Sequence, residues 1–146
     1  MSTVGSYAGY DRVHPLKISG HRIEPFPTTY WLRDGDLHRA VADLERQGWI
    51  KRLEKRVAGD EGFAAFLKAD HARYAAARWA MLDLEQRTLV TRRGWVEALR
   101  DRGVGGVADF TKVKCLHAHV AHALADRAAD SEVINVTGAW ALERIA

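Results

Sequence analysis

Cysteine, proline and long apolar runs are scarce in this 146-residue sequence, which has one cysteine and three prolines. A single cysteine excludes an intrachain disulfide framework, so a hydrophobic core must hold the fold together. No window approaches the roughly 20 apolar residues that a membrane span requires. The first ten residues have neither a basic start nor an apolar stretch, and we expect no signal peptide. These absences predict a soluble, cytoplasmic protein without membrane insertion.

An excess of one charge is also lacking. The chain has 22 Lys and Arg against 19 Asp and Glu, a formal net charge of +3. Its densest basic run, residues 51–56, contains a glutamate, whereas nucleic-acid-binding domains usually gather basic residues on one face. We therefore expect no nucleic-acid partner. The length, with 47% hydrophobic and 28% charged residues, is typical of one globular domain.

The N-terminal part of the chain predicts a little β structure. Residues 1–10 are rich in Gly, Ser and Tyr without periodicity, and we expect a flexible arm there and a single globular domain over residues 11–146. Apolar residues on both sides of Ser19-Gly20 predict a short hairpin. The β-branched and aromatic run over residues 28–32 predicts a strand or extended segment.

The remainder has mostly helical periodicity. We expect helices over residues 37–58 with a bend or end at Gly48, 61–87, 91–102, from a cap at Asp109 through about 125, and 138–145. The β-branched run at 88–91 is expected to break the long second helix. The predicted fold is therefore α+β and mainly α, with a small N-terminal β hairpin or extended segment packed on a four- to five-helix bundle.

The long predicted helix has polar residues inside its apolar stripe. Asp70 lies in the middle of that stripe, and His71, Tyr74 and Arg78 accompany it on the same side. A buried carboxylate without a partner is costly, so Asp70 requires one. Two interpretations remain open: Asp70 pairs with an arginine or caps a neighbouring helix, or the four residues form a polar functional cluster.

The stretch over residues 113–124 holds the only cysteine and three of the seven histidines. On a regular helix, Cys115, His119 and His122 would share one face, and His117 would lie nearly opposite. Such a thiolate and imidazole set could bind a divalent metal such as zinc. Alternatively, Cys115 could be a nucleophile activated by His119, or simply a small buried hydrophobe beside structural histidines.

Several blocks of the sequence occur together in one known family. In order they are Pro25-Phe-Pro-Thr-Thr-Tyr-Trp-Leu32, Leu44-Glu45-x-x-Gly48, His71-x-x-Tyr74-x-x-x-Arg78, Gly105-Gly106 and Val113-Lys-Cys-Leu-His117-x-x-x-Ala-His122. Over about residues 12–126 the chain resembles the bacterial domain of unknown function 501 family. The resemblance implies a small cytoplasmic bacterial protein of unassigned activity. Because genes of the family often lie near one for a septum-formation initiator, it also implies a partner related to cell division.

These observations lead to two hypotheses about function. The first is a ligand-binding or protein-interaction module with a polar pocket for an anionic ligand. Its expected lining is Lys114, Cys115, His117, His122, His71, Tyr74 and Arg78. The second is a metal-binding protein or hydrolase, with Cys115, His119 and His122 as the expected metal ligands and zinc as a candidate ion. The sequence does not decide whether the protein is an enzyme.

Overall fold

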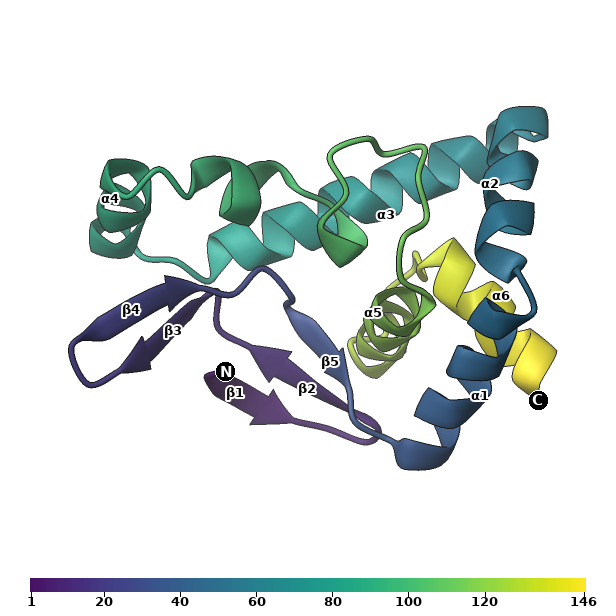
Figure 1. Ribbon diagram of the computed structural model, residues 1–146, viewed down its shortest axis with the longest axis horizontal. Coiled ribbons are helices and arrows are strands. Elements are labelled where there is room, and N and C mark those ends of the chain that lie inside the picture. Colours follow the sequence, from purple (N-terminus) through teal and green to yellow (C-terminus); the bar gives the residue numbers. More distant parts are fainter.

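The computed structural model describes all 146 residues and has an α+β architecture, with two small antiparallel sheets and six α-helices (Figure 1). The strands are β1 (Thr3–Ser6), β2 (Tyr10–Val13), β3 (Leu16–Ser19), β4 (Arg22–Pro25) and β5 (Tyr30–Leu32). The helices are α1 (Gly35–Arg46), α2 (Trp49–Gly59), α3 (Glu61–Ala80), α4 (Leu84–Arg92), α5 (Leu116–Ala128) and α6 (Val136–Ile145). A π-helical turn over Glu97–Asp101 and a 3₁₀ turn over Val104–Gly106 separate α4 from α5.

The strands form a three-stranded sheet, in the order β1-β2-β5, and a separate β3-β4 hairpin. The hairpin lies where the sequence predicts it, because Gly20 adopts a left-handed φ of 60° at its turn. The strand predicted after the prolines is β5, which pairs with β2. Residues 3–6, expected within a flexible arm, form the edge strand β1 instead, paired with β2.

The first helical segment divides at the predicted place. Gly48 has a φ of 82°, a conformation that glycine adopts easily, and this residue ends α1 and begins α2. Asp34 caps α1 through the N–H of Leu37, and Asp60 caps α3 through the N–H of Phe63. Local cap signals therefore determine these three helix starts and ends.

The prediction of one long helix over residues 61–87 is wrong at the C-terminal end. The helix α3 ends at Ala80, and α4 begins with a reciprocal capping box between Asp83 and Gln86. Thr88 and Thr91 lie inside α4, where their hydroxyls donate to the carbonyls four residues earlier. The capping box outweighs the weak helix propensity of the β-branched residues, which amounts to a few tenths of a kcal/mol each.

The predicted start of the cysteine-containing helix is also wrong. Asp109 forms a local turn by accepting from the N–H and hydroxyl of Thr111, and α5 begins only at Leu116. Cys115 is the residue that precedes the helix, with extended backbone at φ −139° and ψ 110°. Its side chain therefore does not follow the helical spacing on which the face shared with His119 and His122 was predicted.

The core lies between the sheet and the helices rather than inside a bundle. In Figure 1, α3 runs along one side of the molecule, α5 and α6 lie beneath it, and α1 and α2 stand at one end. The arrangement differs from the predicted four- to five-helix bundle, because β5 and α6 are the main partners of α5. A second, smaller core joins the β3-β4 hairpin to α4 through Leu16, Leu82 and Val90. None of the helices combines the length and apolar character needed to cross a bilayer.

Candidate functional site

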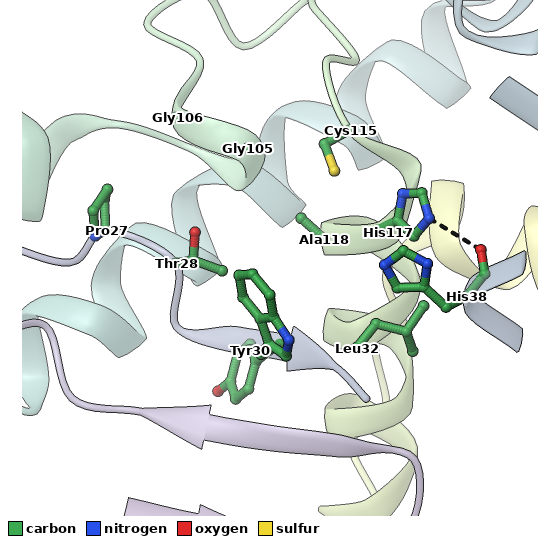
Figure 2. Close-up of a pocket in the computed structure, with 11 residues that line it drawn as sticks. Pro27, Thr28, Tyr30, Leu32, His38, Gly105, Gly106, Cys115, His117 and Ala118 are labelled. Atoms are coloured by element: carbon green, nitrogen blue, oxygen red, sulfur yellow. Dashed lines mark hydrogen bonds between the residues drawn. The ribbon is translucent and has the colours of Figure 1, made fainter. Parts of the chain in front are cut away.

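A cavity of about 350 Å³ opens between β5, the start of α1, the glycine-rich turn and the start of α5 (Figure 2). This volume is in the range of sites for small molecules. Most of its wall is apolar, and Cys115, His117 and His38 bring polar atoms together in one part of it. The lining residues are Pro27, Thr28, Tyr30, Trp31, Leu32, His38, Gly105, Gly106, Cys115, His117 and Ala118.

Cys115 is held at the N-terminus of α5. Its sulfur lies near the backbone N–H groups of His117 and Ala118, in the first turn of the helix. Burial raises the pKa of the Cys115 thiol, and the nearby Glu45 carboxylate adds to the rise, whereas the two N–H groups and Lys114 oppose it. The thiol is consequently neutral near pH 7 and needs a cation or a base to become a thiolate.

His117 has an oxygen atom at each ring nitrogen. Its Nε2 lies 3.1 Å from the backbone carbonyl oxygen of His38, and its Nδ1 lies 3.0 Å from Glu45 Oε1. The carbonyl can only accept, so Nε2 carries a hydrogen. Nδ1 then faces a carboxylate and requires either a second proton or a cation. The other carboxylate oxygen of Glu45 accepts from the N–H of Leu116 at 3.3 Å.

Glu45, Cys115 and His117 form a compact group of potential metal ligands. One ligand atom from each lies within 4.8 Å of the other two, and all three side chains are half-buried. Glu45 comes from α1, 70 positions before Cys115, so the fold alone brings it to the start of α5. No spacing in the sequence identifies Glu45 or His38 as part of a site; Glu45 is distinguished only as a member of one family-like block.

The predicted metal ligands Cys115, His119 and His122 are not brought together. Cys115 faces the cavity, whereas both histidines are buried against Asn135 at the start of α6. The Asn135 amide nitrogen lies 3.1 Å from Nδ1 of His119 and 3.0 Å from Nδ1 of His122, and it donates to both. Burial lowers the pKa of His119 well below its ordinary value and that of His122 to about 4, so both rings are neutral.

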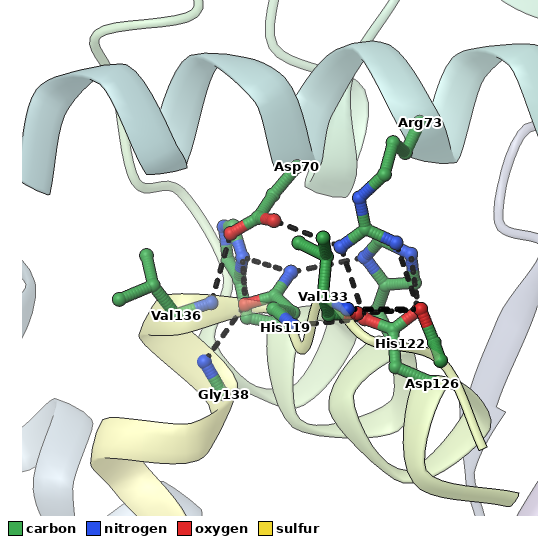
Figure 3. A network of polar contacts seen from close by, with 10 residues as sticks. Asp70, Arg73, His119, His122, Asp126, Val133, Val136 and Gly138 are labelled. Atoms are coloured by element: carbon green, nitrogen blue, oxygen red, sulfur yellow. Dashed lines mark hydrogen bonds and ion pairs between the residues drawn. The ribbon is translucent and has the colours of Figure 1, made fainter.

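Asp70 belongs to a buried ionic network that joins α3, α5 and α6 (Figure 3). The Arg73 guanidinium lies 2.8 Å from oxygens of both Asp70 and Asp126. Asp70 also accepts from the N–H of Val136 at 2.8 Å, at the N-terminus of α6. The interpretation that Asp70 pairs with an arginine or caps a neighbouring helix is therefore confirmed in both parts. Burial raises the pKa of Asp70, and Arg73 and the Val136 N–H oppose that rise.

Arg78 does not line the cavity but forms hydrogen bonds to the segments that make up its walls. It is fully buried, and its guanidinium donates to the carbonyls of Leu99 at 2.7 Å, Pro27 at 3.0 Å and Arg102 at 2.6 Å. These carbonyls belong to the segment before β5 and to the loop before the glycine-rich turn. One side chain on α3 thus fixes two separate walls of the cavity.

Tyr74 and His71 have the same role one and two turns away on α3. The Tyr74 hydroxyl accepts from the N–H of Thr29 at 2.8 Å, beside β5. His71 Nδ1 accepts from the N–H of Val104 at 2.9 Å, and its Nε2 donates to the Lys112 carbonyl at 2.9 Å. Of the seven residues predicted to line a pocket, Cys115 and His117 do so, and Lys114 is exposed outside it. The remaining residues, His71, Tyr74, Arg78 and His122, are buried in supporting positions.

Comparison with known proteins identifies one family. The family described as "Protein of unknown function (DUF501)" matches residues 10–143, which is nearly the whole chain. No curated protein and no solved structure matches the chain.

Proposed function

The chain belongs to the DUF501 family of proteins of unknown function, and from its geometry we propose that it binds a small molecule in the cavity beside Cys115 and His117. The observation that carries this proposal is the cavity itself, about 350 Å³ in volume with apolar walls and one polar end. Binding sites for small molecules are mostly apolar concavities with a few convergent polar groups that set orientation.

The cavity walls are held rigidly, which favours a role in ligand binding. Three buried side chains of α3 anchor the segments that surround the cavity: Arg78, Tyr74 and His71. Each forms hydrogen bonds to backbone atoms of segments far away in the sequence. A site whose supporting residues are themselves locked loses little free energy to ordering when a ligand enters.

The lining indicates the shape of the ligand. Trp31, Leu32 and Tyr30 supply an aromatic and aliphatic wall, suited to a flat or branched apolar body. Beside this wall, Cys115, His117 and His38 offer polar groups, which suit a single polar head group on that body (Figure 2). Lys114 and Arg78 do not reach the cavity, so a highly charged anion such as a polyphosphate finds no guanidinium or ammonium there.

A thiol hydrolase is less well supported by the same geometry. A nucleophilic cysteine needs a base within hydrogen-bond reach, and the predicted base, His119, is buried against Asn135. His117 is close to Cys115, but both of its ring nitrogens already face oxygen atoms. No free imidazole nitrogen is left to take the proton of Cys115 in this arrangement.

The proposal is tested by recording amide spectra of the isotope-labelled protein with a library of small aromatic carboxylic acids. We expect a subset to shift the amide resonances of Gly105, Gly106 and Ala118, which border the cavity. Thr28→Trp places an indole in the cavity and should abolish these shifts. Thr88→Trp, on the exposed face of α4, is the matched control and should leave them unchanged. Shifts that persist in Thr28→Trp, or a library that shifts none of the three amides, would remove the proposal.

A further inference from the structure

We propose that Glu45, Cys115 and His117 bind a zinc ion whose fourth coordination position faces the cavity. Zinc binding at this position would not depend on an organic ligand in the cavity. It rests on three features of the site: the chemistry of the three side chains, the hydrogen bonds that orient Glu45 and His117, and the direction in which the site is open.

The chemistry of the donor set fits zinc. Thiolate, imidazole and carboxylate are the three side-chain types that bind Zn²⁺, and a thiolate disfavours the hard ions Mg²⁺ and Ca²⁺. In a tetrahedral site with bond lengths of 2.0–2.3 Å, ligand atoms lie about 3.3–3.8 Å apart. Here the Glu45 and His117 atoms are 3.0 Å apart, and all three ligand atoms lie within 4.8 Å of one another. Side-chain movements of less than about 1 Å would complete the geometry.

Backbone groups orient His117 and Glu45. His117 donates its Nε2 hydrogen to the His38 carbonyl, the arrangement that fixes the tautomer of metal-binding histidines and leaves Nδ1 as the ligand atom. Glu45 accepts from the N–H of Leu116 through Oε2, which leaves Oε1 directed at His117. The sulfur of Cys115 lies near the backbone N–H groups of His117 and Ala118 at the N-terminus of α5. Hydrogen bonds to the backbone therefore orient two of the three ligands, His117 and Glu45.

A cation also resolves the one unfavourable contact in the group. With hydrogen on Nε2, a neutral His117 directs the lone pair of Nδ1 at a carboxylate oxygen 3.0 Å away. A divalent ion between these atoms turns repulsion into coordination. A second proton on the ring is the competing solution, and the two differ in whether metal is taken up.

The open position determines what the site can bind. Three protein ligands with a fourth position left to water or substrate is the pattern of catalytic zinc sites, whereas structural sites are closed by four protein ligands. Cys115 and His117 both line the cavity, so the fourth position faces the space proposed for the ligand. A carboxylate or thiolate head group of a ligand would complete the coordination, and a water molecule would take the fourth position when no ligand is bound.

The experiment is a zinc competition titration against a chromophoric chelator, using tag-free, metal-stripped protein. We expect the wild type to take up one zinc ion per chain. Cys115→Ser, His117→Gln and Glu45→Gln should each weaken zinc binding at least about 100-fold, because each removes a direct ligand and not only a supporting contact. His21→Gln and Glu143→Gln change exposed residues of the same types and serve as matched controls without effect.

Cobalt(II) substitution of the wild type provides a second readout that does not depend on the folding of any variant. A thiolate ligand predicts a sulfur-to-cobalt charge-transfer band together with the intense visible bands of a tetrahedral site. Absence of stoichiometric metal in the wild type, or zinc affinity unchanged in Cys115→Ser, would overturn the proposal. The titration contains none of the aromatic carboxylic acids, and the amide-shift assay is to be run on metal-stripped protein, so each proposal can fail without the other.

Discussion

Replacing Arg78 with methionine tests whether α3 holds the walls of the cavity. The guanidinium donates to three backbone carbonyls on two segments, at 2.6–3.0 Å. Methionine fills a similar length but donates nothing, so all three carbonyls lose their partner. The change therefore removes the hydrogen bonds between α3 and the walls with little loss of side-chain volume.

The magnitude follows from these bonds and from the burial of the charge. A hydrogen bond to a charged group contributes about 1.5–3 kcal/mol, which gives a gross loss of about 4.5–9 kcal/mol for three bonds. Against this, burial lowers the pKa of Arg78, so the variant gains back part of the desolvation free energy of the guanidinium. We expect a net loss of about 3–5 kcal/mol in the free energy of unfolding.

Urea denaturation followed by circular dichroism measures this loss. Arg87→Met is the matched control, because Arg87 donates to a single carbonyl, that of Trp79, and should lose about 1.5 kcal/mol, the lower end of the same range. Arg78→Lys keeps the charge but cannot place three donors in a planar fork, so most of the loss should persist. A loss below about 1 kcal/mol for Arg78→Met would refute the supporting role of this residue.

Two further predictions concern the contact between α5 and α6. A Cβ at Gly138 would lie 2.2 Å from the His119 carbonyl oxygen, so Gly138→Ala should lower the free energy of unfolding by about 3 kcal/mol. Gly59 has open space around it, so Gly59→Ala is the control and should change stability little. Equal losses in the two variants would contradict this packing. The pKa of His122 is about 4 in the folded protein, against about 6.5 when unfolded, so protonation favours the unfolded chain. The neutral state of His122 therefore contributes about 3 kcal/mol to the free energy of unfolding above pH 6.5, and this contribution is lost as the pH falls to about 4. Denaturation at several pH values should show this dependence reduced in His122→Gln and unchanged in His21→Gln; the same slope in both variants would contradict it.

Features with a local cause were predictable from the sequence. The break at Gly48 and the hairpin at Gly20 each depend on a glycine that adopts a positive φ within a few residues of the pattern that predicts it. The need of Asp70 for a partner was also predictable, since an aspartate within an apolar stripe must be compensated. Its partners were not: Val136 lies 66 positions away, and only the packing of α6 against α3 brings its N–H to the carboxylate.

The site was predicted only in part, for two physical reasons. The helical spacing of Cys115 with His119 and His122 assumed a helix that begins near Asp109, and the turn formed by Asp109 and Thr111 delays that start to Leu116. Because Cys115 precedes the helix with extended backbone, its side chain faces the cavity and not His119 and His122. The other reason is that Glu45 reaches Cys115 through the packing of α1 against α5, which no local periodicity records.

Zinc X-ray absorption of the tag-free wild-type protein tests directly whether zinc binds at the polar end of the cavity. The geometry predicts one sulfur at about 2.3 Å, from Cys115, and nitrogen or oxygen ligands at about 2.0–2.2 Å, from His117, Glu45 and a water molecule. Loss of the sulfur shell in Cys115→Ser should follow. A spectrum of bound zinc with nitrogen and oxygen ligands only would contradict the account, as would protein that retains no zinc.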